Sequence, residues 1–237
     1  GEKSLHKLLD ELNKINGLFW IRIMYCYPEE ITEELVQTIK TEKKICHYLD
    51  LPIQHCNDDI LKRMGRKTTQ ADLREKISML RKEIPDIALR TTLISGFPGE
   101  TNENHEECVD FVANMKFERL GVFPYSPEEG TPAAGYDRQL PEEIKQEWAD
   151  EIMQTEQNVI FAQNEEMIGR RLSVIVDGYL PEDGVYVGRT YRDAPEIDGC
   201  LFFEAPYEII SGTILPVLVT DANGYDLIGE ILPEEDD

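Results

Sequence analysis

The chain has 237 residues, of which 41% are hydrophobic and 8% aromatic. This composition is typical of a globular protein with one large domain or two modest ones. Its 47 acidic and 24 basic residues give a formal net charge of −23. Because nucleic-acid affinity depends largely on Lys and Arg side chains that neutralise phosphates, this balance argues against a general nucleic-acid-binding protein.

The apolar runs and the cysteines exclude two further classes of protein. Runs such as 17–21 and 214–219 are too short to span a bilayer, and the charged amphipathic start does not resemble a signal peptide. The five cysteines are odd in number and contain no CxxC pair, so we expect dispersed thiols, no disulfide framework and no metal site. This pattern predicts a cytoplasmic protein. The cysteines are Cys26, Cys46, Cys56, Cys108 and Cys200.

Helix and strand patterns alternate over the first 125 residues. Apolar residues at helical spacing, clearest over 4–15, predict helices, and short β-rich runs predict strands. The predicted helices are 4–15, 32–41, 69–84 and 102–115, and the predicted strands are 19–25, 48–53, 88–94 and 119–125. Strands separated by 35 to 40 residues with helices between them indicate right-handed βαβ units in a parallel sheet.

The pattern of predicted elements changes after a Pro/Gly-rich loop at 127–137. A long helix is predicted to begin at Pro141, a residue favoured in the first helical turn, and to run towards Ile168. Five short strands are predicted beyond it, at 172–176, 185–189, 201–204, 214–219 and 225–232. Asn223-Gly224 is a strong hairpin signal, and the whole pattern predicts a small β-barrel of the oligonucleotide-binding kind.

Polar residues follow the predicted parallel strands, where the sites of α/β barrels lie. The loop Gly96-Phe97-Pro98-Gly99-Glu100 joins a buried strand to a helix amino terminus. Its glycines allow a ligand to approach the backbone, and its free amides suit a carboxylate or a polar heterocycle. The alternative is an ordinary turn that Pro98 stiffens. His55, at another strand end, is either a ligand or a structural histidine, and Arg90 needs a polar partner or points outward.

Four segments of the sequence then carry a family resemblance. LDLPIQHCNDDILKRMGRKTT, LRTTLISGFPGET, FPYSPEEGTPA and GRTYRDAPEIDG follow in this order. They resemble the radical S-adenosylmethionine methylthiotransferases, and the resemblance covers 4–232. It implies a partial parallel (βα) barrel of the radical SAM type followed by a small five-stranded β-barrel similar to a TRAM domain. The expected divisions are 1–140 for the partial barrel, 141–169 for a linking helix, 170–233 for the β-barrel and 234–237 for an acidic tail.

The resemblance also implies a cofactor, S-adenosylmethionine, and [4Fe–4S] clusters in the complete enzyme. The residues expected to bind S-adenosylmethionine are Gln54, His55, Arg90, Gly96, Phe97, Gly99, Glu100 and Tyr125. The family's CxxxCxxC cluster loop does not occur in this sequence. We therefore expect the chain to correspond to the back part of the enzyme, to lack cluster ligands and to be inactive alone.

Within the family, IQH and DAPEIDG resemble the branch that methylthiolates an aspartate of ribosomal protein uS12. From Arg170 onward there are 15 acidic residues, four arginines and no lysine. Such a surface can simply favour solubility, or it can attract a basic protein partner. On the second interpretation, Asp193, Glu196 and Asp198 are predicted to contact uS12. The alternatives are a tRNA methylthiotransferase, which the acidic charge disfavours, and a docking module without activity.

Overall fold

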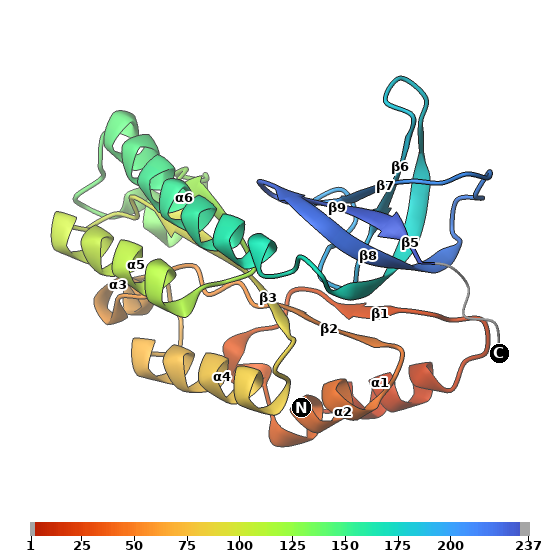
Figure 1. The fold of residues 1–237 in the computed structure, drawn as a ribbon. Helices are drawn as coiled ribbons and strands as arrows, with labels where there is room; N and C mark the ends of the chain where they lie inside the picture. Colours follow the sequence, from red (N-terminus) through yellow and green to blue (C-terminus); the bar gives the residue numbers. More distant parts are fainter. Residues whose placement is uncertain (1–2, 233–237) are drawn as a thin grey trace. The chain divides into compact units, whose positions relative to one another are not determined.

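A computed structural model describes residues 3–232 of the chain (Figure 1). It divides into two compact units, Gly1–Glu156 and Gln157–Asp237. The division falls within the long helix α6 (Glu142–Glu165), which accounts for most of the linking helix predicted at 141–169. The acidic tail predicted at 234–237 lies outside the described residues.

The first unit is built on a four-stranded parallel sheet with the strand order β1-β2-β3-β4. The strands are β1 (Ile21–Ile23), β2 (Ile45–Asp50), β3 (Ala88–Ser95) and β4 (Arg119–Pro124). The helices are α1 (Leu5–Asn13), α2 (Glu33–Thr41), α3 (Asp58–Arg63), α4 (Gln70–Glu83) and α5 (Asn102–Met115), with short 3-10 helices at Pro28–Glu30 and Pro132–Gly135. The prediction of a parallel α/β sheet is therefore confirmed.

One strand of this unit is shifted from its predicted position, and one helix was not predicted. Strand β2 begins at Ile45 and ends at Asp50, whereas the prediction placed it at 48–53. The six-residue helix α3 was not predicted, because it is too short to show a helical stripe. Its start is fixed by Asn57, whose side chain accepts hydrogen bonds from the amides of Asp59 and Ile60.

The core of the first unit lies against one face of the sheet. Helices α1, α2 and α4 run along the same side of the strands in Figure 1. Along β3, Leu89, Thr91 and Leu93 are buried, while Arg90, Thr92 and Ile94 are partly exposed. Because successive side chains of a strand point to opposite faces, this alternation gives the sheet one apolar face and one partly polar face. The partly polar face carries Arg90.

Capping boxes begin helices α4 and α5. Thr69 and Asp72 exchange side-chain and backbone hydrogen bonds at the start of α4. Thr101 and Asn104 do the same at the start of α5, which places the first turn of that helix directly after Glu100. Each box satisfies amides that a helix start leaves without partners. The loop at 96–100 is thus held between β3 and a firmly capped helix.

The second unit is a closed β-barrel with the strand order β5-β6-β7-β9-β8. Its strands are β5 (Arg171–Leu180), β6 (Val185–Arg189), β7 (Leu201–Glu204), β8 (Ile214–Asn223) and β9 (Asp226–Ile231). Val174, Phe203 and Val217 are among the buried residues that fill it. The predicted five-stranded β-barrel is confirmed, and so is the hairpin at Asn223-Gly224, where Gly224 has a positive φ of 64°.

No helix within residues 3–232 is both long enough and apolar enough to cross a membrane.

Candidate functional site

The carboxyl ends of β2 and β3 are joined beyond the regular sheet by Gln54. Its amide donates to the Thr92 carbonyl at 2.9 Å, and its carbonyl accepts from the Ile94 amide at 2.8 Å. Gln54 has a positive φ of 71°, a conformation that costs energy for any residue except glycine. The chain therefore turns at Gln54, and its pairing with β3 ends directly before His55.

Arg90 is paired with a buried carboxylate. Its Nη1 lies 3.2 Å from Oδ1 of Asp50, which is the neighbouring residue in the β2–β3 register. The other Asp50 oxygen accepts a hydrogen bond from the Tyr25 amide at 3.1 Å. Of the two alternatives for Arg90, a polar partner or an outward-pointing side chain, the structure shows the polar partner. Asp50 was not recognised in the sequence, although a carboxylate within the run YLDLPI is a signal that a cation lies nearby.

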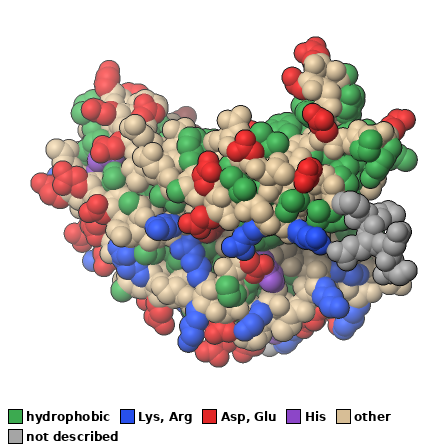
Figure 2. Space-filling view, in the orientation of Figure 1, with side chains coloured by type: hydrophobic (Ala, Val, Ile, Leu, Met, Phe, Trp, Pro, Cys, Tyr) green, Lys and Arg blue, Asp and Glu red, His purple; other side chains and the backbone are tan. Residues whose placement is uncertain are grey.

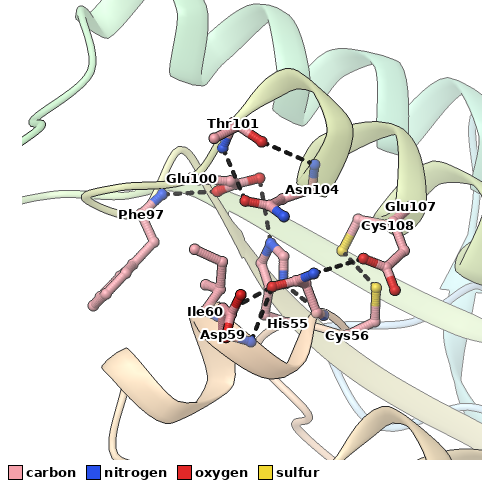
Figure 3. Close-up of polar contacts among 11 residues, drawn as sticks. His55, Cys56, Asp59, Ile60, Phe97, Glu100, Thr101, Asn104, Glu107 and Cys108 are labelled. Atoms are coloured by element: carbon pink, nitrogen blue, oxygen red, sulfur yellow. Dashed lines mark hydrogen bonds and ion pairs between the residues drawn. The ribbon is translucent and has the colours of Figure 1, made fainter.

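His55 and Glu100 face each other in the interior (Figure 3). His55 Nε2 lies 3.3 Å from Glu100 Oε1, and both side chains are fully buried. Glu100 Oε2 accepts the Phe97 amide at 2.9 Å, and His55 Nδ1 accepts the Asn57 amide at 3.0 Å. The pair thus joins the loop after β2 to the loop after β3. This geometry favours the structural interpretation of His55 over a direct contact with a ligand.

Several neighbouring groups act on the pKa of His55. Burial lowers the pKa of His55, but the neighbouring Cys108 and Glu100 outweigh burial and raise the pKa overall. A hydrogen bond from Cys56 lowers the pKa of Cys108, and the nearby His55 lowers it further against the opposing effect of burial. A buried charge is tolerated only when it is paired. His55 and Cys108 therefore shift each other's pKa values in opposite directions.

The two glycines of the GFPGE loop are closely covered by side chains of the chain itself. Gly96 and Gly99 have positive φ values of 74° and 90°. A Cβ atom at Gly96 would overlap with carbon atoms of Lys145, and one at Gly99 would lie 3.0 Å from Arg63 Nε. The sequence predicted that these glycines let a ligand approach the backbone; the groups that approach it here are Lys145 and Arg63. Neither cation was anticipated from the sequence.

Phe97 and Tyr125 form an aromatic cluster at the same edge. Their ring centroids are 5.1 Å apart in an edge-to-face arrangement, and Tyr136 packs on the other side of Phe97 at 6.3 Å. Lys145 Nζ donates to the Tyr125 carbonyl at 2.9 Å. The buried Tyr125 hydroxyl has no hydrogen-bond partner among residues 3–232. Because buried polar groups are almost always satisfied, this hydroxyl is suited to a bound polar molecule.

Two of the cysteines are adjacent, contrary to the prediction of dispersed thiols. Cys56 Sγ and Cys108 Sγ lie 3.4 Å apart, and the ligand atoms of these two residues and of His55 all lie within 4.8 Å of one another. The prediction was wrong because 52 residues separate the two cysteines along the chain. Packing of α5 against the loop after β2 brings them together, and no local spacing rule detects such a contact.

The three acids predicted to contact a partner protein do not form one exposed group. Asp193 is only 3% exposed, and its Oδ2 accepts hydrogen bonds from the Thr190 amide and hydroxyl. Asp198 is partly buried and accepts the Ala194 amide at 2.8 Å. Only Glu196 is exposed. The prediction treated Asp193 as a surface charge, and this is corrected, because Asp193 serves to close a tight turn.

Exposed acids instead line a groove on the barrel. Asp183, Glu204 and Glu230 are exposed and border a depression of about 630 Å³ together with apolar side chains that include Phe202 and Ile228. Figure 2 shows one face of the molecule, on which acidic and hydrophobic side chains lie side by side at the tip of the β5–β6 hairpin. A groove of this composition suits a partner that carries both cations and apolar groups.

Comparison with known proteins assigns both units to families. Residues 1–112 match the radical SAM superfamily, and residues 168–232 match the TRAM domain. The first matched segment contains β1, β2 and β3 of the parallel sheet, and the second contains the closed barrel. Together they describe the class of protein: a parallel α/β sheet of the radical SAM type followed by a β-barrel of the TRAM type.

Two curated proteins are similar to nearly the whole of this chain. Ribosomal protein uS12 methylthiotransferase RimO from Lachnoclostridium phytofermentans is 56% identical over 229 residues, which are 97% of this chain and 52% of that protein. RimO from Clostridium botulinum strain Loch Maree is 50% identical over 234 residues, 99% of this chain and 52% of that protein. The chain is a homologue of RimO, and it spans about half the length of the curated relatives it matches.

Among solved structures, the archaeal Elp3 of Methanocaldococcus infernus has a TM-score of 0.47 at 16% identity. The similarity covers 66% of this chain and 37% of that one.

Proposed function

We propose that this chain belongs to a radical S-adenosylmethionine enzyme that methylthiolates an aspartate of ribosomal protein uS12. The observation that carries the proposal is 56% identity to a RimO protein over 97% of the chain. The matched region extends through both units, so that relative has segments that correspond to the strand ends and to the barrel. The exposed acids of the barrel groove support a basic protein substrate.

The edge of the sheet supplies the residues that would hold S-adenosylmethionine. The buried Tyr125 hydroxyl, which has no partner among the described residues, and the part-exposed side chain of Gln54 offer polar contacts. Arg90 offers a cation fixed in place by Asp50. These groups fit a ligand that carries a carboxylate and polar ring atoms. His55, Glu100 and the two loop glycines support these groups and do not contact the ligand themselves, because each of them already packs against another residue of the chain.

The remaining chemistry belongs to the complete enzyme. S-adenosylmethionine and [4Fe–4S] clusters would supply a radical that abstracts hydrogen from the aspartate β-carbon before sulfur and methyl are added. This sequence contains no CxxxCxxC loop, so the proposal assigns to this chain the binding and positioning of cofactor and substrate. On this proposal the chain alone does not methylthiolate uS12, and it acts in the cytoplasm, where ribosomal proteins are modified.

A tRNA methylthiotransferase is the second candidate, and the charge of the barrel argues against it. From Arg170 onward the sequence carries 15 acids and four arginines. Two of these arginines are paired or buried: Arg189 forms two contacts with Asp177 at 2.8 and 2.9 Å, and Arg192 is buried. Few cations are therefore left to neutralise phosphates.

The proposal is tested in cells that encode this chain by disrupting its gene. Mass spectrometry of uS12 peptides is expected to show loss of the methylthio group from the aspartate, while methylthiolated tRNA nucleosides remain unchanged. Restoring the intact gene is expected to restore the modification. Loss of the tRNA modification with intact uS12 would place the chain in the tRNA-modifying branch. No change in either would favour a docking role without catalysis.

A further inference from the structure

The cluster of His55, Cys56 and Cys108 is the most unusual feature outside the proposed cofactor contacts. His55 and Cys56 follow β2 through a short loop, and Cys108 lies in the middle of α5 (Figure 3). The three residues are 1%, 0% and 1% exposed. It is the one group of three or more potential metal ligands found among residues 3–232.

The dimensions of the cluster match those of a metal centre. Zinc binds thiolate sulfur at about 2.3 Å and imidazole nitrogen at about 2.0–2.1 Å, so two sulfurs on one tetrahedral ion lie roughly 3.8 Å apart. The two sulfurs here are 3.4 Å apart, and the imidazole ligand atom lies within 4.8 Å of both. Small side-chain shifts would place all three atoms around a single ion.

We propose that His55, Cys56 and Cys108 bind one thiophilic divalent metal ion, with Zn²⁺ as the best chemical match. Two thiolates and one imidazole are ligands that zinc prefers over harder cations such as Mg²⁺. Both cysteines bind as thiolates, so any proton that a thiol still carries is released when the ion binds. The two thiolate charges balance the charge of the ion, which leaves a neutral centre inside the core.

The residues around His55 can hold its imidazole ring in the orientation that metal binding needs. Histidines that bind metals usually donate their other ring N–H to a carboxylate or a carbonyl. Glu100 Oε1 lies 3.3 Å from His55 Nε2 and is in place for this role. Nδ1 is then the ligand atom, and binding of the ion replaces the hydrogen bond from the Asn57 amide. Glu100 is in turn fixed by the Phe97 amide.

The metal centre would tie together two parts of the sheet edge. It would link the loop after β2, which carries Gln54, to α5, which begins directly after the GFPGE loop. Loading of the ion would stabilise the folded chain, because the unfolded chain does not hold the three ligands together. This role is independent of the proposed methylthiolation, and its test needs no catalytic activity.

The experiment uses the whole chain, treated with a chelator and kept under a non-coordinating reductant. Titration with Co²⁺ is expected to saturate at one equivalent, with an intense thiolate-to-cobalt charge-transfer absorption that Zn²⁺ abolishes. Cys56→Ala and Cys108→Ala should each remove much of this absorption and weaken Zn²⁺ binding on the order of 100-fold or more. Even the loss of an outer partner costs about 10–100-fold. Cys26→Ala is the matched control, because Cys26 is also buried in the core of the first unit, and it should bind as the unchanged protein does.

Two further measurements keep the test decisive if a cysteine variant fails to fold. In the unchanged protein, bound Zn²⁺ should protect Cys56 and Cys108, and not Cys26, from alkylation followed by mass spectrometry. Glu100→Gln should weaken Zn²⁺ binding about 10–100-fold while the cobalt–thiolate absorption persists. The proposal is overturned if Co²⁺ gives no thiolate absorption under reductant, if Zn²⁺ protects neither thiol, or if folded Cys56→Ala binds Zn²⁺ as tightly as the unchanged protein.

Discussion

The acidic residues at the sheet edge are buried, whereas three of those that border the barrel groove are exposed. At the edge of the sheet, Glu100 and Asp50 are buried, and each is paired with a basic side chain. On the barrel groove, acids such as Glu204 and Glu230 are exposed. Buried pairs hold loops in a defined geometry, whereas exposed acids contribute little to stability and are available to a partner. The comparison separates residues that build a site from residues that recognise a molecule.

Removing Glu100 should have the largest effect on stability. Glu100→Ala leaves His55 buried without its carboxylate and the Phe97 amide without its acceptor. Breaking one partner of a buried charged pair typically costs about 3–5 kcal/mol in the free energy of unfolding. Urea denaturation would measure this cost. Glu103→Ala, a few residues further along in α5 and exposed, is the control and should change stability by less than about 1 kcal/mol. Equal effects would contradict the paired geometry.

A substitution at Gly96 should be more harmful than the same substitution at Gly65. Both glycines have a φ of 74°, so the backbone strain of Gly→Ala is the same at the two positions. The new methyl group meets Lys145 at Gly96, whereas nothing lies within 4 Å at Gly65. We expect Gly96→Ala to destabilise the fold by about 1–3 kcal/mol more than Gly65→Ala, which is the usual cost of overpacking. Thermal unfolding of the two variants would measure the difference, and equal losses would show that Lys145 moves aside freely.

Within the barrel, the two kinds of acid can be compared directly. Asp193→Ala removes the acceptor for the Thr190 amide and hydroxyl and should cost about 1–3 kcal/mol. Glu196→Ala, in the same segment but exposed, should change stability by less than about 0.5 kcal/mol. Chemical denaturation of both variants would test the assignment. If Asp193→Ala did not change the free energy of unfolding, Asp193 would again be a candidate for contact with a partner protein.

Most of the fold was predictable because its signals are local. The stripe of apolar residues in α4, the β-rich run of β3 and the Asn223-Gly224 turn each lie within a few residues of sequence. The site was less predictable, because its contacts are between distant residues. Cys56 and Cys108, for example, are separated by 52 positions. In the sequence, such residues are visible only as polar groups within apolar runs. This pattern does not identify the residue that each of them contacts.

Association with uS12 is the most direct measurement of the barrel's role. The triple variant Asp183→Asn, Glu204→Gln, Glu230→Gln removes three exposed charges of the groove and should leave unfolding free energy within about 0.5 kcal/mol for each change. Biolayer interferometry at low and high salt, with tRNA as a competitor, would compare it with the unchanged chain. We predict salt-sensitive binding of uS12 by the unchanged chain, a slower on-rate for the triple variant and no effect of tRNA. Tight, salt-sensitive tRNA binding with no response to uS12 would contradict the account.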